Sequence, residues 1–262
     1  MSAVRLRNLT LGYERRPAVH HLEGAFAEGR LSAVVGPNGS GKSTLLKGVA
    51  GAIRPLSGQI ELSGLKPRDI AYLPQDHGIS KTFPMTLEAL VSLGLWNRRG
   101  MFGAITSKDR VRIADAFAAV GLTGFEHRGV DQVSGGQLQR ALFARVLVQD
   151  ARLILLDEPF AALDARTTAD LVSLIQRWPG EGRTVVMVLH DLDMVRKTCG
   201  DTLLLAREAV AWGETESTLR PENLLKARRL SEAWAEHAHV CHHDDAPAPE
   251  HGDPHAPAHS HP

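Results

Sequence analysis

The sequence contains no apolar segment long enough to cross a bilayer. Its unbroken aliphatic runs, at residues 153–156 and 185–189, are about a quarter of the roughly 20 residues that a membrane-spanning helix needs. The opening MSAVRLRNLTLGY alternates apolar and polar residues and lacks the apolar stretch of about 7–15 residues that marks a secretory signal. We therefore expect a protein that stays in the cytosol and does not itself span a membrane.

The sequence also has no net charge and only two cysteines. The 30 Lys and Arg residues balance the 30 Asp and Glu residues, so no global field draws the chain to nucleic acid or anionic lipid, and we expect no nucleic-acid partner. The two cysteines, Cys199 and Cys241, form no C-x-x-C pattern, which argues against a disulfide framework and fits a reducing compartment. By contrast, 43% of the 262 residues are hydrophobic, which suffices for the core of one large domain or two small ones.

Short apolar segments alternate with helix-like segments along most of the chain. Continuously apolar strands separated by helices indicate a mostly parallel sheet that is covered on both faces. The expected strands are 31–35, 70–73, 153–156, 184–189 and 202–205, and the expected helices between them include 42–52 and 165–177.

Two regions break this alternation. Helical patterns at 86–93, 107–120 and 135–149, with a Gly- and Arg-containing loop at 97–104, predict a helical insertion over about 84–150. The last 26 residues hold eight of the 13 histidines and five of the 14 prolines. Such a segment buries little apolar surface, so we predict a folded domain over 1–236 and a disordered tail over 237–262.

A glycine-rich motif follows the first apolar strand and opens a helix. It matches the pattern G-x-x-x-x-G-K-[ST] in full and consists of Gly36, Pro37, Asn38, Gly39, Ser40, Gly41, Lys42, Ser43 and Thr44. Glycines let successive backbone N–H groups surround phosphate oxygens, and the following helix adds its positive dipole end. Lys42 would reach the β- and γ-phosphates of ATP, and the Ser43 hydroxyl would bind Mg²⁺. A turn that matches by chance would not explain the strand and helix around it.

Two adjacent carboxylates, Asp157 and Glu158, follow the apolar strand at 153–156. Ligands collect at this end of the strands in α/β sheets. Asp157 would hold Mg²⁺ through a water molecule, and Glu158 would accept a proton from the attacking water. The alternative explanation for the pair is the polar end of a strand, which the glycine-rich motif disfavours.

The segment Val133-Ser-Gly-Gly-Gln137 lies between these two motifs. With it, the sequence resembles the ATP-binding subunits of ABC transporters, whose signature usually reads L-S-G-G-Q, over about residues 3–230. Val133 departs from the usual Leu, and we expect that exchange to affect packing more than chemistry. The resemblance implies an α/β fold over 1–236, in which a P-loop NTPase (RecA-like) core has an antiparallel β subdomain and an inserted α-helical subdomain.

The resemblance implies roles for four further residues. Tyr13 would stack on adenine, and Gln75 would sense the nucleotide and contribute to the Mg²⁺ site. Asp164 would belong to the D-loop of the nucleotide site, and His190 would contact the γ-phosphate and help to orient Glu158. Simpler explanations are an edge-strand aromatic for Tyr13, a loop amide for Gln75 and a capping side chain for His190.

The resemblance also implies that one chain is incomplete. In the family, two ATP-binding subunits pair head to tail, and each ATP lies between the P-loop of one subunit and the signature of the other. Ser134, Gly135, Gly136 and Gln137 would therefore contact the ATP of a partner chain. A separate permease would provide the membrane pathway, so we expect a homodimer at the cytoplasmic face of the cell membrane, served indirectly by an extracytoplasmic metal-binding protein.

Three segments, 74–90, 98–103 and 157–160, resemble the ATPases of zinc, manganese and iron importers. Importers of ferric siderophores and cobalamin share parts of these segments. We expect the ATPase of a transition-metal importer, with zinc as the first cargo, and an importer of metal chelates such as siderophores or haem as the alternative.

The tail favours a metal as the cargo. Imidazole and thiolate suit Zn²⁺, and also Cu or Ni, better than Mg²⁺ or Ca²⁺. The candidate ligands are His237, His239, Cys241, His242 and His243. Their spacing matches no closed zinc finger, so we expect weak, exchangeable binding. The alternative is a solubilising tail with incidental metal affinity, or a remnant of cloning.

Two functions outside metal import fit the sequence less well. A soluble ABC ATPase of translation or repair usually carries two cassettes or a long coiled-coil insertion, and the sequence has neither feature. A metal buffer that acts through its tail would leave a complete ATP motif without a purpose.

Overall fold

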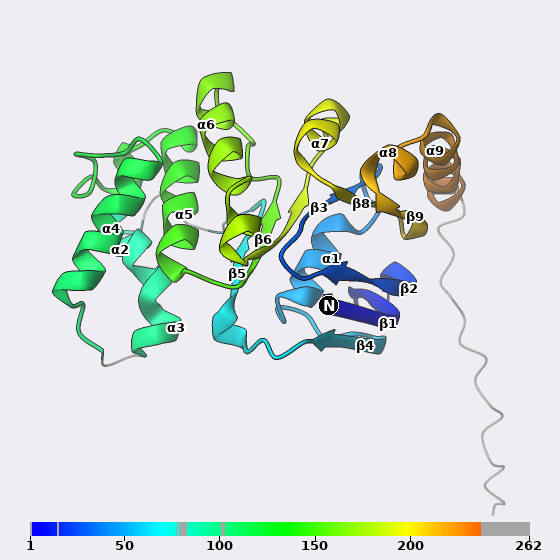
Figure 1. The fold of residues 1–262 in the computed structure, drawn as a ribbon, viewed down its shortest axis with the longest axis horizontal. Helices are drawn as coiled ribbons and strands as arrows, with labels where there is room; N and C mark the ends of the chain where they lie inside the picture. The colour runs from blue at the N-terminus through cyan, green and yellow to red at the C-terminus, as the bar shows by residue number, and fades with distance from the viewer. Residues whose placement is uncertain (1, 15, 77, 79–82, 101–102, 237–262) are drawn as a thin grey trace, which may run out of the picture.

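The computed structural model describes residues 2–14, 16–76, 78, 83–100 and 103–236. A group of helices lies at one end of the molecule, a central sheet follows, and a smaller sheet lies at the other end (Figure 1). Among the helices of these residues, none combines the length and the apolar character needed to cross a membrane.

The smaller sheet is antiparallel, with the strand order β2-β1-β4. Its strands are β1 (Ser2–Tyr13), β2 (Arg16–Ala27) and β4 (Ser57–Leu62). In β1, Val4 and Leu6 are buried and the residue between them is exposed, because successive side chains of a strand point to opposite faces. The apolar face of this sheet therefore packs toward the centre of the molecule.

The central sheet has the strand order β5-β6-β7-β3-β8-β9. Its strands are parallel except β9, which pairs antiparallel with β8. The predicted, mostly parallel sheet is confirmed, and the middle strands are buried along their whole length. The strand bounds are β3 (Leu31–Val35), β5 (Ile70–Leu73), β6 (Leu153–Asp157), β7 (Thr184–Val188), β8 (Asp201–Ala206) and β9 (Glu208–Glu214).

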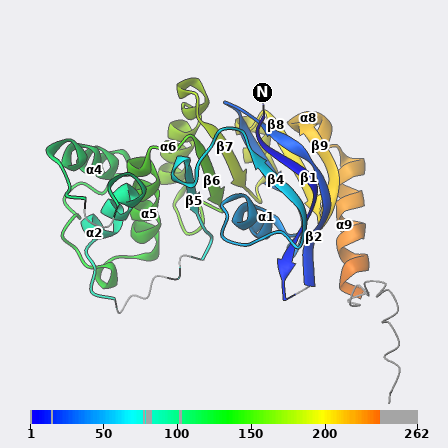
Figure 2. The same ribbon diagram turned by 90° about the horizontal axis from the view of Figure 1, so that it is seen from below.

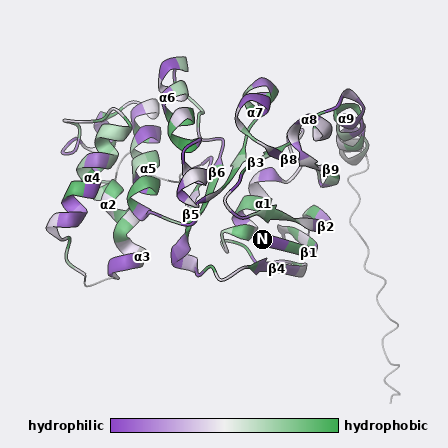
Figure 3. Cartoon of the chain, viewed as in Figure 1, coloured by the Kyte–Doolittle hydropathy of each residue, from purple (hydrophilic) through white to green (hydrophobic). Residues whose placement is uncertain are grey.

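Two hydrophobic clusters cover the two faces of the central sheet. In β3, Val34 packs toward the cluster that contains α1 (Lys42–Val49) and the antiparallel sheet, whereas Ala33 and Val35 belong to the other cluster. Figure 2 shows α1 between the two sheets. Hydrophobic residues dominate the central strands, and the outer helices mix hydrophilic and hydrophobic residues (Figure 3). The later helices are α6 (Ala165–Ile175), α7 (Leu192–Thr198), α8 (Thr215–Thr218) and α9 (Pro221–Glu236).

The group of helices at the end opposite the smaller sheet consists of α2, α3, α4 and α5 (Figure 1). Their bounds are Leu87–Ser92, Trp96–Arg99, Ser107–Ala119 and Gly135–Gln149. The prediction of a loop over 97–104 is wrong for residues 97–99, because these residues belong to α3. Arg98 pairs with Asp150 at 2.7 Å and Arg99 with Asp109 at 2.6 Å, and these distant partners were not visible as a pattern. The domain limits at 84–150 and 236 stay predictions.

Two expected helices end earlier than the sequence suggested. Helix α1 ends at Val49 and not at residue 52, because Gly51 adopts a left-handed φ of 75° just beyond it. Helix α6 ends at Ile175 and not at residue 177. Short 3-10 segments occupy Pro67–Asp69, Leu93–Leu95, Val130–Gln132 and Trp178–Glu181.

Candidate functional site

The glycine-rich loop connects the end of β3 to α1 by a sharp turn. Gly36 has a φ of 154°, and a Cβ atom there would overlap the carbonyl oxygen of Leu205 in β8. Gly41 has a φ of 94°, and a Cβ atom there would lie 2.5 Å from the carbonyl oxygen of Ala18 in β2. Any side chain at these two positions would push the loop off both neighbouring strands, so the loop depends on glycine.

Helix α1 presents its N-terminus to this loop. The N-cap residue is Gly41, so no side chain satisfies the first backbone N–H groups of the helix. Lys42 is 6% exposed, and its ammonium group donates to the carbonyl oxygens of Gly36 and Pro37, both at 2.9 Å. Burial lowers the pKa of Lys42, and the carboxylates of Glu158 and Asp157 at the end of β6 oppose that shift. Uncapped N–H groups beside a desolvated cation suit a phosphate group.

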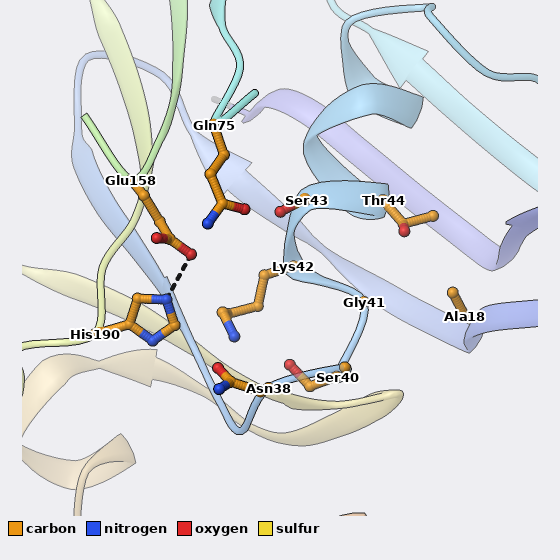
Figure 4. A pocket seen from close by; sticks show the side chains of 11 residues that line it. Ala18, Asn38, Ser40, Gly41, Lys42, Ser43, Thr44, Gln75, Glu158 and His190 are labelled. Atoms are coloured by element: carbon orange, nitrogen blue, oxygen red, sulfur yellow. Dashed lines mark hydrogen bonds and ion pairs between the residues drawn. The ribbon is translucent and has the colours of Figure 1, made fainter. Parts of the chain in front are cut away.

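A cavity of about 640 Å³ lies against the loop (Figure 4). Residues from five separate segments line it: Ala18, Asn38, Gly39, Ser40, Gly41, Lys42, Ser43, Thr44, Gln75, Glu158 and His190. The fold thus brings most of the predicted P-loop together with Gln75, Glu158 and His190. In Figure 4 the Gln75 amide points into the space between Ser43 and Glu158. Ala18 is an addition that no motif marked, since only its strand pairing places it there.

Asp157 ends β6 and is fully buried. The Ser43 hydroxyl donates to its Oδ1 at 3.0 Å, and the Tyr72 hydroxyl donates to its Oδ2 at 3.4 Å. Burial raises the pKa of Asp157 against these two hydrogen bonds, and burial also raises the pKa of Tyr72. A carboxylate beside a serine hydroxyl is an oxygen donor set that fits Mg²⁺. No sequence motif marks the contact of Tyr72 with Asp157.

Glu158 and His190 are in contact with each other on one side of the cavity. The Nε2 atom of His190 lies 2.5 Å from the Oε1 atom of Glu158 (Figure 4). Glu158 has a left-handed φ of 50°, which a residue with a side chain keeps only where its surroundings hold it. Its backbone N–H donates to the carbonyl oxygen of Val188 in β7 at 3.3 Å. The Glu158 carboxylate is thus held in a fixed position in the cavity, and a general base that activates water needs such a position.

Tyr13 does not line the cavity. It lies at the end of β1 and is 47% exposed, and the Lys47 ammonium lies 5.8 Å from the centroid of its ring. A half-exposed ring beside a cation is a reasonable stacking surface, but the contact with adenine stays a prediction.

The signature residues lie at the N-terminus of α5, outside the lining of the cavity. Ser134 is the N-cap: its hydroxyl accepts from the Gln137 N–H at 3.2 Å, and the Gln137 side chain accepts from the Ser134 N–H at 2.9 Å. Gly135 is exposed and Gly136 is half-buried. Val133 is 5% exposed in the hydrophobic core, which agrees with the expected packing role.

Asp164 lies outside the cavity lining as well. It caps α6, and its carboxylate accepts from the Thr167 N–H at 2.9 Å and from the Thr167 hydroxyl at 2.7 Å. These hydrogen bonds lower the pKa of Asp164. Its role in the D-loop stays a prediction.

The predicted zinc ligands of the tail lie outside the described residues. They are His237, His239, Cys241, His242 and His243. In the part of the chain that the structure does describe, no group of three or more His, Cys, Asp or Glu side chains is arranged to hold a metal ion.

Known proteins are similar to this chain in sequence and in fold. The sequence profile of the ABC transporter family matches residues 19–161. The manganese transport system ATP-binding protein MntB of Listeria monocytogenes is 38% identical over 224 residues, which are 84% of this chain and 93% of that protein. The zinc transport system ATP-binding protein TroB of Treponema pallidum is 35% identical over 229 residues, 86% of each chain.

A solved structure extends the similarity to three dimensions. It is described as a metal-chelate type ABC transporter in an inward-facing conformation, and it superposes with a TM-score of 0.76 at 31% identity, covering 87% of this chain and 90% of that chain. The profile match, the relatives and the shared fold agree. The chain therefore belongs to the ABC transporter family and is an ATPase.

Proposed function

We propose that this ATPase powers the import of a transition metal, with zinc as the first candidate cargo and manganese as the second. The observation that carries the proposal is the similarity, over more than four fifths of the chain, to ATP-binding proteins of manganese and zinc transport systems. The metal-ligand types in the tail favour zinc. A metal chelate is the alternative cargo, which the similarity to a metal-chelate type transporter favours.

ATP would enter the cavity with its phosphates at the glycine-rich loop. The Lys42 ammonium donates to two backbone carbonyl oxygens at 2.9 Å, and phosphate oxygens would replace these acceptors. Ser43 and Asp157 would hold Mg²⁺, and Gln75 lies near enough to the Ser43 side of the cavity to contribute. When bound, Mg²⁺ neutralises charge on the phosphates.

Hydrolysis would use the pair on the opposite side of the cavity. Glu158 would take the proton of the attacking water as the water's oxygen approaches the γ-phosphate. His190, 2.5 Å from the Glu158 carboxylate, would hold that carboxylate in place and lie close to the γ-phosphate. Catalysis would therefore depend on the placement of both side chains in the cavity.

The site would be completed by a second copy of the chain. The signature residues lie outside the cavity of their own chain, with Ser134 and Gly135 exposed at a helix N-terminus. In a head-to-tail homodimer, that N-terminus would meet the ATP bound by the partner chain. Asp164, at the start of the next helix, would lie in the same interface.

A permease would supply the membrane pathway. The proposed homodimer would bind such a permease at the cytoplasmic face of the cell membrane, and an extracytoplasmic metal-binding protein would deliver the cargo. Residues 237–262 would form a separate metal-binding tail that exchanges Zn²⁺.

Cellular metal content tests the cargo. Deletion of the gene in its own host should lower cell-associated zinc, measured by mass spectrometry for zinc, manganese and iron in the same cells. The wild-type gene should restore the metal, and a Glu158→Gln gene should not. A selective loss of manganese would replace zinc by manganese, and a loss only of chelated iron would favour the alternative cargo. Unchanged metal contents would contradict the proposal.

A further inference from the structure

Helix α5 is in direct contact with the turn that follows Glu158. A Cβ atom on Gly136 would lie 3.0 Å from the carbonyl oxygen of Ala162. Three residues further along the helix, the Gln139 side-chain amide donates to the carbonyl oxygen of Pro159 at 3.0 Å. Residues i and i+3 lie on the same face of a helix, so one face of α5 contacts both ends of the turn.

The contact at Gln139 is buried. Gln139 is 6% exposed and Pro159 is buried, so water has little access to replace the amide. A buried carbonyl oxygen that loses its donor is destabilised, and the backbone around it shifts to find another. The signature motif ends at Gln137, and it marks no role for Gln139.

The turn has a backbone that needs such support. Glu158 and Ala162 have left-handed φ angles of 50° and 61°, which residues with side chains adopt only where neighbours hold them. Within the turn, the Ala161 N–H donates to the Glu158 carbonyl oxygen at 3.2 Å, at the long end of the usual range. The bond from Gln139 is shorter, and it comes from a helix of 15 residues.

We infer that Gln139 is a positioning residue for hydrolysis: its amide holds the Pro159 carbonyl group and so keeps the adjacent Glu158 where its carboxylate reaches His190. The inference rests on the proposed role of Glu158 as the base, and it is independent of the cargo. Gln139 lies in the second turn of the helix whose N-terminus would meet the partner's ATP. A shift of that helix would therefore move Glu158 of the same chain.

Gln139→Met tests this role, because methionine has a similar length and no amide donor. In the full-length chain, we expect the Kd for ATP to stay within about threefold of wild type while kcat at saturating ATP falls about 10- to 100-fold, as for a misplaced catalytic group. Titration calorimetry gives the Kd, and phosphate release gives kcat.

Gln149→Met is the matched control. Gln149 ends the same helix, and its amide donates to the carbonyl oxygen of Ile70 at 2.6 Å, at the opposite end from the signature. Both variants lose a side-chain hydrogen bond to a backbone carbonyl, so both should lower Tm. Only Gln139→Met should lower kcat.

Two results would overturn the inference: a kcat for Gln139→Met within about threefold of wild type, or equal losses of kcat in both variants, which would indicate general destabilisation. Glu158→Gln, assayed alongside, tests separately whether Glu158 is the base. If Glu158→Gln abolishes turnover and Gln139→Met does not, only the positioning role of Gln139 is refuted. Wild-type turnover in Glu158→Gln would refute both. The assay contains no transported metal, so neither result bears on the cargo.

Discussion

The P-loop and the signature segment differ in how completely one chain assembles them. At the P-loop, side chains from β2, α1, the β5 and β6 ends and the β7 end converge on one cavity. At the signature, Ser134 and Gln137 bond to each other at the exposed start of α5. The first region is preorganised for phosphate within the chain. The second satisfies its own polar groups and faces outward.

This difference separates two functions. Nucleotide binding should need only the P-loop side, because Lys42 and the α1 N-terminus are already directed into the cavity. Hydrolysis in the proposed dimer should need both sides, because the γ-phosphate would lie between them. Variants on the two sides should therefore affect different measurements.

The largest expected effect is on turnover in Glu158→Gln. Loss of a general base lowers the rate about 10²- to 10⁴-fold, whereas the amide keeps the size of the side chain and should leave ATP binding intact. ATP should then hold two chains together, which size-exclusion chromatography with light scattering will detect. Glu181→Gln, at an exposed position paired with Arg183, is the control and should hydrolyse ATP normally. Wild-type turnover in Glu158→Gln would refute its assignment as the base.

Lys42→Ala should act on binding. The variant loses hydrogen bonds to charged phosphate oxygens, so the Kd for ATP should rise roughly 10- to 100-fold. Titration calorimetry on the single chain measures this rise. Lys108→Ala removes an exposed lysine of α4 and should leave the Kd unchanged. An unchanged Kd in Lys42→Ala would place the phosphates elsewhere.

Ser134→Ala should distinguish the role of the signature segment from that of the P-loop. Loss of the N-cap should cost about 1 kcal/mol of stability, and loss of a bond to the partner's ATP should lower turnover about 10-fold. The Kd for ATP of the single chain should not change. Thr106→Ala removes the equivalent cap of α4, and it should lower stability without affecting turnover. A weaker Kd in Ser134→Ala would show that the signature contacts the nucleotide of its own chain.

Deletion of 237–262 should have the smallest effect on turnover. The ATP site consists of other residues, so the rate with Mg²⁺ should stay within about twofold of wild type. Several equivalents of zinc binding should be lost in equilibrium titration at neutral pH. In the full chain, zinc binding should weaken as pH falls toward about 5.5, because free histidine protonates near a pKa of about 6.5. Equal zinc binding with and without the tail would exclude it as a metal site.

Much of the central sheet was predictable because its signals are local. The strands at 31–35 and 70–73 match β3 and β5, since a continuous apolar run is itself the mark of a buried parallel strand. Helix α3 was missed because only four residues form it and because the partners of its arginines, Asp109 and Asp150, lie outside the helix. Periodicity cannot reveal a helix of one turn.

The candidate site was predictable wherever a local sequence motif includes the residues of the site. Gly36 and Gly41 mark a loop because their backbone angles admit no other residue, and Lys42 follows from their spacing. Ala18 and Tyr72 gave no such signal. They reach the site by strand pairing and by a side chain that crosses from β5 to β6.

By itself, the sequence determined the segments: the glycine loop, the apolar strands, and the carboxylates at a strand end, since each depends on backbone angles or periodicity within a few residues. Only the tertiary structure decided which segments meet. Ser43 bonds to Asp157 across 114 positions, and His190 meets Glu158 across 32. These contacts depend on the strand order β5-β6-β7-β3, which brings the carboxyl ends of the strands to one edge, and no local pattern encodes that order.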